Sequence, residues 1–320
     1  MIIHKKWRGK RLKIVILLYS FYMNTYLQCI PCLFENIVSS AALFHLSDTQ
    51  AKEIMDHLGS LLKETPLSAS PPERAVAVQK KLCSILNTDD PYKEIKKESN
   101  DKALELYPII EHMVEMSSNP LSLAIELSCA GNIIDYGVTG KEIDVEKEIR
   151  AIIAKSEKKI KKEASSLFAF DEFVSSIEKA KTLLFLADNA GEIVFDRLLL
   201  ETIKQLYPAL KITVALRDTP IINDALVSDA YDIGLDKSAT IISSGVPTPG
   251  TVLRYASKEF LDLFYSSDMV VSKGQGNYEA LSEVNRDIFF LLITKCDVVA
   301  RHVGSHVGDI LLLNSEPTFQ

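Results

Sequence analysis

The stretch Thr182–Glu192 reads TLLFLADNAGE and gives the strongest indication of the fold. Residues 182–187 are apolar almost without interruption, and the polar run Asp188-Asn189-Ala190-Gly191-Glu192 follows at once. A strand that does not alternate between apolar and polar residues is typical of a parallel sheet covered by helices on both faces. Because ligands bind beyond the carboxyl ends of such strands, the polar run is a candidate site segment.

Similar apolar runs alternate with helical patterns through the second half of the chain. A helix is expected from about Glu192 to Leu206, and another near Asn223–Asp232. The further strand candidates are Lys211–Leu216, Ala239–Ser243, Met269–Ser272, Ile288–Thr294 and Ile310–Leu313. This alternation predicts an α/β fold, in which a parallel or mostly parallel sheet forms the middle of a three-layer α/β/α arrangement.

The first half is predicted to be helical. Ser47 with Asp48, Ser70-Pro71-Pro72 and Asp90-Pro91 are helix start signals, and apolar residues at helical spacing follow each of them. Residues 141–165 are rich in Lys and Glu, which is typical of a solvated helix leading into the second half. The predicted division is an extension over 1–22, a helical domain over 23–165 and an α/β metal-binding catalytic domain over 166–320.

Residues 1–22 contain six basic and no acidic side chains. The apolar run Ile14–Phe21 is shorter than the ~20 residues that a membrane-spanning helix needs. No small-x-small cleavage site follows it, and the chain continues from Met23 into a helical pattern. Met23 is therefore a candidate start, with residues 1–22 mistranslated from upstream; a signal or anchor and a structured extension are the alternatives.

The charge and the cysteines limit the class of protein. The 320-residue chain has a net charge of −7, and beyond residue 22 it holds 30 basic against 43 acidic residues. Nucleic-acid binding needs a cationic face, so neither nucleic acid nor membrane is expected as a partner. The five cysteines are an odd number with one close pair, Cys29 and Cys32, which does not suggest a disulfide framework. A reducing cytosol is the simpler compartment.

Polar groups follow each of the first five predicted strands. The first strand is followed by the run Asp188–Glu192 given above. The next four are followed, in order, by Arg217-Asp218 with Asn223-Asp224, by Ser243-Ser244-Gly245, by Lys273-Gly274-Gln275-Gly276-Asn277 and by Lys295-Cys296-Asp297. Loops are polar in general, so one such case would be weak evidence. Five in succession, mixing carboxylates with lysines, indicate one shared site.

The residue types in these segments favour phosphoryl chemistry. Asp188, Asn189 and Asp224 offer hard oxygen ligands for an ion such as Mg²⁺ or Mn²⁺. Lys273 and Lys295 would lie opposite them as point charges, where they could offset charge on a transferring phosphoryl group. The plainer interpretation is that Asp188 and Asn189 only cap the following helix.

Four ordered motifs resemble the damage-control phosphatase family. They are Asp188-Asn189-x-Gly-Glu192, Pro220-x-x-Asn223-Asp224, Lys273-Gly274-x-x-Asn277-Tyr278 and Gly131-Asn132-Ile133-Ile134-Asp135. Tyr26-x-x-Cys29-Ile30-Pro31-Cys32 is similar to the archaeal-type branch, and the resemblance extends from Met23 to the C-terminus. It implies a phosphatase that uses a divalent ion (Mn, Co, Ni or Mg) to hydrolyse small phosphorylated metabolites, such as sugar phosphates or damaged phosphometabolites.

The resemblance and the residue chemistry together predict the site. Asp188, Asn189 and Asp224 are the expected metal ligands, and Asp188 and Lys273 are the expected catalytic residues. The expected substrate-binding residues are Asn132, Asp135, Glu192, Arg217, Gly274, Asn277 and Lys295. Attack by a metal-activated water and direct attack by Asp188 are both open.

Three other interpretations stay open at this point. The chain could be a carboxyl methyltransferase that uses S-adenosylmethionine, or a metabolite-binding protein without catalysis. Cys29 and Cys32 could bind a metal or cycle between redox states, or form a half-buried pair at a helix start.

Overall fold

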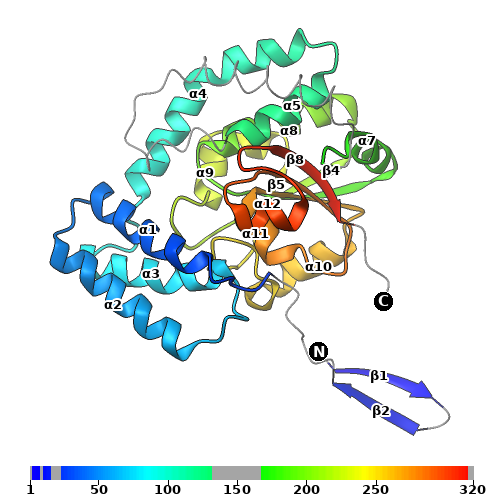
Figure 1. Ribbon diagram of the computed structural model, residues 1–320. Coiled ribbons are helices and arrows are strands. Elements are labelled where there is room, and N and C mark those ends of the chain that lie inside the picture. The colour runs from blue at the N-terminus through cyan, green and yellow to red at the C-terminus, as the bar shows by residue number, and fades with distance from the viewer. Residues whose placement is uncertain (1, 8–9, 16–22, 132–166, 316–320) are drawn as a thin grey trace.

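The computed structural model describes residues 2–7, 10–15, 23–131 and 167–315 (Figure 1). In these ranges the helices are α1 (Cys29–Leu43), α2 (Asp48–Glu64), α3 (Pro71–Leu86), α4 (Lys93–Glu115), α5 (Pro120–Ala130), α7 (Phe170–Lys179), α8 (Glu192–Leu206), α9 (Val227–Asp232), α10 (Lys258–Ser266), α11 (Gly274–Leu281) and α12 (Asp297–Val303). The strands are β1 (Ile2–Trp7), β2 (Lys10–Val15), β3 (Thr182–Leu186), β4 (Lys211–Leu216), β5 (Thr240–Ser243), β6 (Met269–Lys273), β7 (Ile288–Ile293) and β8 (Ile310–Ser315).

The six strands β3 to β8 form one sheet in the order β5-β4-β3-β6-β7-β8. All neighbouring pairs are parallel except β7 and β8, which are antiparallel. The predicted α/β class with a mostly parallel sheet is therefore confirmed. β8 is the exception, because it continues the series of apolar runs but returns in the opposite direction.

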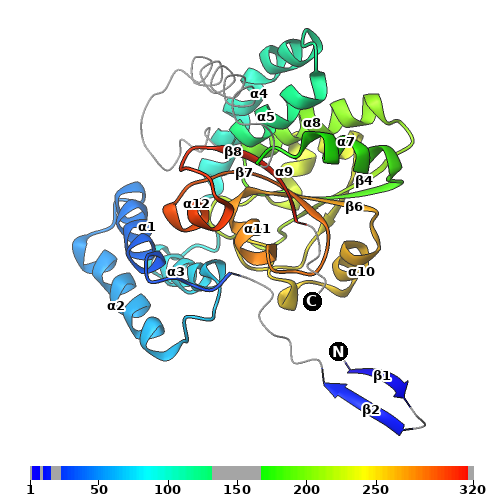
Figure 2. The ribbon, with the colours of Figure 1, turned by 45° about the vertical axis from the view of Figure 1, so that its right-hand side comes forward.

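Helices cover both faces of the sheet (Figure 2). Leu183 and Phe185 of β3 belong to a buried cluster that also holds side chains of α4, α5, α7 and α8. Leu184 and Leu186, on the opposite face, join a second cluster with side chains of α10, α11 and α12. Successive residues of a strand point to opposite faces, so an uninterrupted apolar strand is buried on both.

The predicted helix start signals near Ser47 and Ser70 lie where helices begin. Ser47 and Gln50 form a capping box at α2, and Ser70 with Glu73 forms another at α3. Helices α1 to α3 share a small core of their own around Leu33, Ile54 and Leu82. Helices α4 and α5 instead pack into the core of the sheet.

The predicted boundary at 165/166 and the helix over 141–165 lie outside the described residues, so the proposed division into domains stays a prediction. Strands β1 and β2 pair as an antiparallel hairpin, drawn apart from the sheet in Figure 1. Of the helices in the described ranges, none is long and apolar enough to cross a lipid bilayer.

Candidate active site

The segments after β3 and β4 are joined by backbone hydrogen bonds. The amide of Ala225 donates to the carbonyl of Asp188 at 2.8 Å, and the amide of Ala190 donates to the carbonyl of Asn223 at 3.0 Å. Asn189 and Asp224 lie opposite each other in an isolated antiparallel bridge. The loop after β4 thus folds back on the end of β3 and brings together the three predicted metal ligands.

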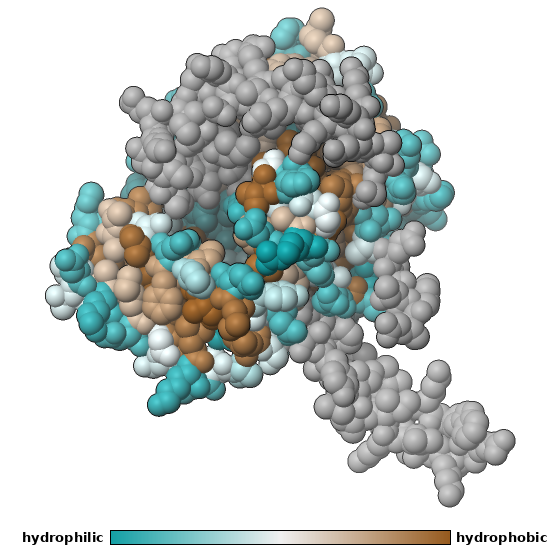
Figure 3. Space-filling view, in the orientation of Figure 1, coloured by the Kyte–Doolittle hydropathy of each residue, from teal (hydrophilic) through white to brown (hydrophobic). Residues whose placement is uncertain are grey.

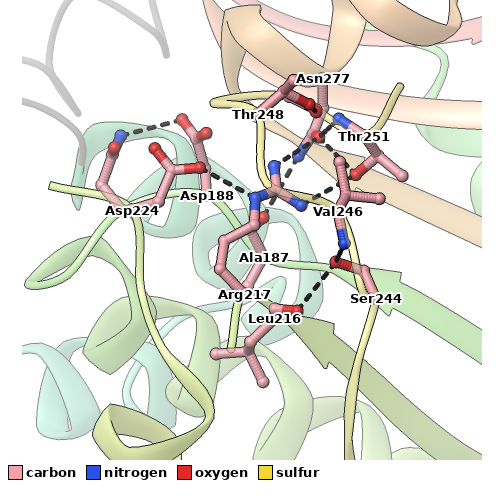
Figure 4. A network of polar contacts seen from close by, with 12 residues as sticks. Ala187, Asp188, Leu216, Arg217, Asp224, Ser244, Val246, Thr248, Thr251 and Asn277 are labelled. Atoms are coloured by element: carbon pink, nitrogen blue, oxygen red, sulfur yellow. Dashed lines mark hydrogen bonds and ion pairs between the residues drawn. The ribbon is translucent and has the colours of Figure 1, made fainter. Parts of the chain in front are cut away.

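Arg217, the residue after β4, fixes the orientation of Asp224 (Figure 4). Its Nε donates to Asp224 Oδ2 at 3.0 Å, and the two residues are 2% and 3% exposed. The other guanidinium nitrogens donate to Thr251 Oγ1 at 3.1 Å and to Asn277 Oδ1 at 3.2 Å. Arg217 and Asn277 were predicted to bind substrate, but the structure places them in this buried network.

Gly274 lies directly behind the carboxylate of Asp188. A Cβ on Gly274 would come within 2.9 Å of Asp188 Oδ1 and still closer to Oδ2, and the glycine has a φ of +77°. Only glycine combines this left-handed backbone with so close an approach. Gly274, a predicted substrate-binding residue, therefore makes room for Asp188.

The two carboxylates are buried beside each other, and this raises their pKa values. Burial raises the pKa of Asp188 well above its usual value, and the charges of Glu192 and Asp224 raise it further. Burial likewise raises the pKa of Asp224 to about 6, although Arg217 acts in the opposite direction. Both groups would be stabilised in their charged form by a cation bound between them.

Asn189 is held by two carboxylates. Its Nδ2 donates to Asp188 Oδ2 at 2.9 Å and to Glu192 Oε2 at 3.2 Å. Glu192 was predicted to contact substrate, but it is only 2% exposed. Its other oxygen, Oε1, accepts from Lys273 Nζ at 2.7 Å.

The position predicted for Lys273 is corrected by the structure. We expected its ammonium opposite the metal ligands, facing the phosphoryl group. Instead Lys273 has no exposed surface, and its Nζ contacts the carbonyl of Ser128, Glu192 and Asp196. The reason is strand alternation: Met269 and Val271 of β6 face α5 and α8, and Lys273 follows them on the same face.

A cleft of ≈ 490 Å³ opens above the carboxyl ends of the strands, between them and the α1–α3 helices. Figure 3 shows the surface hollowed between α1 and the neighbourhood of α12. Four predicted site residues line the cleft, namely Asp188, Asn189, Asp224 and Lys295. Lys295 is exposed, and it is the one Lys or Arg among the described residues that line the cleft.

The remaining predicted site residues lie elsewhere. Glu192, Arg217, Lys273, Gly274 and Asn277 are buried beneath the cleft rather than lining it. Asn132 and Asp135 lie outside the described residues, so their predicted contact with substrate stays a prediction.

Cys29 and Cys32 line the cleft from the first turn of α1. Both thiols are free, Cys29 partly buried and Cys32 exposed. Burial raises the pKa of each thiol above its ordinary value, which disfavours the reactive thiolate.

The structure adds residues that the motifs did not indicate. Asn100 of α4 accepts from the amide of Gly191 at 2.6 Å, and the carbonyl of Ser128 of α5 accepts from Lys273 Nζ at 2.9 Å. Asp196 lies one helical turn after Glu192, so its i, i+4 spacing could have indicated it. No local signal could have indicated Asn100 or Ser128.

The ligand set fits a hard divalent cation. Within the described ranges, no three His, Cys, Asp or Glu side chains group as a metal site. The candidate set is therefore two carboxylates, Asp188 and Asp224, with the carboxamide of Asn189. All three side chains offer oxygen, which is the donor that Mg²⁺ and Mn²⁺ take in proteins.

Comparison with known proteins shows the family of the chain. Residues 25–311 match the model of the damage-control phosphatase ARMT1-like domain. A damage-control phosphatase of Pyrococcus horikoshii is 33% identical over 257 residues, which are 80% of this chain and 85% of that protein. A damage-control phosphatase of Archaeoglobus fulgidus is 32% identical over 289 residues, or 88% and 96%. The crystal structure of a DUF89 family protein from Pyrococcus horikoshii superposes with a TM-score of 0.78 at 29% identity, covering 92% of this chain and all of that one. The chain thus belongs to the damage-control phosphatase ARMT1-like family.

Proposed function

We propose that this protein is a cytosolic phosphatase that depends on a divalent cation and hydrolyses phosphomonoesters of small metabolites. One observation supports this most: Asp188, Asn189 and Asp224 lie together at the strand ends, in the same cleft as the cation Lys295. Family membership supports phosphatase activity in metabolite repair.

Asp188, Asn189 and Asp224 would hold the cation, which supplies positive charge to polarise the phosphoryl oxygens. Lys295 would bind a further phosphoryl oxygen through its ammonium. Such contacts accelerate the reaction when they strengthen as charge develops in the transition state. Arg217 contributes indirectly, because it holds Asp224 in one orientation through their 3.0 Å hydrogen bond.

The opposite wall of the cleft suits an uncharged leaving group. Apolar side chains from α1 and α3, among them Leu33, Val78 and Leu82, lie next to the amide and hydroxyl groups of Asn36 and Ser40. These groups can contact carbon surface and hydroxyls, but none of them carries a positive charge that would pair with a second phosphate. We therefore expect monophosphates to be better substrates than bisphosphates.

The test is phosphate release from a panel of phosphomonoesters with Mn²⁺, Co²⁺, Ni²⁺ or Mg²⁺ and with chelator. Turnover should need a divalent ion, and Asp224→Asn should lower it strongly, because a charged oxygen ligand becomes neutral while the shape is kept. The matched control is Asp218→Asn, which changes an exposed carboxylate in the same loop and should keep wild-type activity. Full turnover in excess chelator would refute the metal dependence.

The methyltransferase alternative is not supported, since the matching family model and both named relatives are phosphatases. A non-catalytic binding protein would bind phosphorylated metabolites without releasing phosphate from any of them.

A further inference from the structure

Lys273 has no hydrogen-bond donor left for a substrate. An ammonium group has three N–H donors and no acceptor. The three partners of Nζ are the Ser128 carbonyl at 2.9 Å, Glu192 Oε1 at 2.7 Å and Asp196 Oδ1. The two carboxylates outweigh the effect of burial and raise the pKa of Lys273, so the ammonium is charged and fully used.

Glu192 connects this ammonium to the candidate metal ligands. One of its oxygens accepts from Lys273, and the other accepts from Nδ2 of Asn189 at 3.2 Å. Asn189 Nδ2 carries two hydrogens, and the second is donated to Asp188 Oδ2 at 2.9 Å. The amide nitrogen is therefore fully used by carboxylates.

The orientation of the Asn189 carboxamide decides whether it can bind a cation. Its carbonyl oxygen has lone pairs, whereas its amide nitrogen has none to offer. An ionised Glu192 can only accept a hydrogen bond, so it requires Nδ2 on its side and leaves Oδ1 for the cation. Lys273 donates to Oε1 of Glu192, which leaves Oε2 as the acceptor on the side of Asn189 Nδ2.

From this chain of contacts we infer that Lys273 and Glu192 are positioning residues. They orient the carboxamide of Asn189 at the candidate cation site and do not contact the phosphoryl group. The inference rests on the proposed function, because it assigns a role at the same cation site. Partners that orient a metal ligand affect binding although they do not touch the ion.

The test measures Mn²⁺ binding without substrate, by the electron paramagnetic resonance signal of free Mn²⁺. Glu192→Gln keeps the size of the side chain but adds a donor that competes for the carboxamide of Asn189. We expect its Mn²⁺ dissociation constant to rise roughly 10–100-fold, the usual effect of losing such a partner. Lys273→Met should weaken Mn²⁺ binding similarly.

The double variant, Glu192→Gln with Lys273→Met, tests whether the two residues act through one path. Its loss should be no larger than that of the weaker-binding single variant, whereas independent roles would add. The matched control is Glu201→Gln, because Glu201 lies on the same helix and pairs with Arg197 but does not reach Asn189. It should bind Mn²⁺ as the wild type does. Melting temperatures measured in chelator show how far each variant is destabilised.

Four outcomes would overturn the inference. One is that Glu192→Gln binds Mn²⁺ as tightly as the wild type does. Another is that Lys273→Met keeps wild-type Mn²⁺ affinity but binds inorganic phosphate more weakly, which would make Lys273 a phosphate ligand. A third is a lower melting temperature with unchanged Mn²⁺ affinity, which would make the role merely structural. The fourth is an additive loss in the double variant. If Lys273→Met does not fold, Glu192→Gln alone decides. Absence of Mn²⁺ binding in the wild type would instead refute the proposed function.

Discussion

Gly274→Ala should separate the geometry of the site from the stability of the fold. The new Cβ would lie 2.9 Å from Asp188 Oδ1 and closer to Oδ2, whereas ordinary contacts begin at 3.4 Å. The carboxylate would have to retreat by about 1 Å or more at its nearest oxygen, a displacement that can cost ~10²-fold in rate. The left-handed backbone adds a cost of about 1–2 kcal/mol to a residue with a side chain.

Gly304 offers a matched control, because it has nearly the same backbone with free space around it. Its φ is +75°, and an added Cβ would meet nothing within 4 Å. Gly304→Ala should therefore lose about 1–2 kcal/mol in urea unfolding and keep full activity. Gly274→Ala should lose at least as much stability, and in addition ~10²-fold in kcat/KM and much of its Mn²⁺ affinity. Equal activity in the two variants would refute the reasoning that Gly274 makes room for Asp188.

Three further predictions concern the charges of the site. Lys295→Ala should lower kcat/KM roughly 10²-fold in steady-state phosphate release. The control is Lys237→Ala, which changes an exposed lysine outside the cleft and should leave kcat/KM unchanged. Equal effects of the two substitutions would remove Lys295 from the site. Mn²⁺ affinity should fall as the pH falls through about 6, because protons on Asp224 and Asp188 compete with the cation. Calorimetric titrations with Mn²⁺ from pH 5 to 8 would check this. In the metal-free protein the raised pKa of Asp224 means that the free energy of unfolding falls as the pH rises between about 3.8 and 6. Arg217→Met should cost about 3–5 kcal/mol in urea unfolding, because it leaves Asp224 buried without its partner; a loss below 1 kcal/mol would contradict this.

The sheet could be predicted because its strands are buried on both faces. Lys211–Leu216 has the predicted bounds, and the other strands shift by a few residues at their ends. The direction of β8 was not indicated by its apolar run. Ile310 pairs with Ile293, and β8 runs back beside β7.

The location of the site could be predicted, but the depth of each residue could not be read from strand ends alone. Asp188 and Asp224 come together because parallel strands end at one edge and the loop after β4 folds back. Lys273 also ends a strand, yet the alternation that places Met269 and Val271 against α5 and α8 carries it down into the helical layer. Applied to β6, the same alternation would have predicted this burial.

The contribution of the helical half could not be predicted, because it depends on contacts far apart in the sequence. Asn100 and Ser128 meet Gly191 and Lys273 only after α4 and α5 have packed on α8. Helical periodicity indicates which face of these helices is buried, but not which polar side chain will meet which loop. The helices that cover the sheet thus also support the site from below.

The charges beneath the cleft support the proposed divalent ion. Four buried carboxylates, Asp188, Glu192, Asp196 and Asp224, lie in this region with two buried cations. Arg217 pairs with Asp224, and Lys273 pairs with Glu192 and Asp196. When all are ionised, two negative charges remain uncompensated in a region where burial makes charge costly. Burial raises the pKa of Asp196 and that of Asp224 to about 6, which reflects this cost of charge. A divalent cation at Asp188 and Asp224 would offset this negative charge more completely than a monovalent ion.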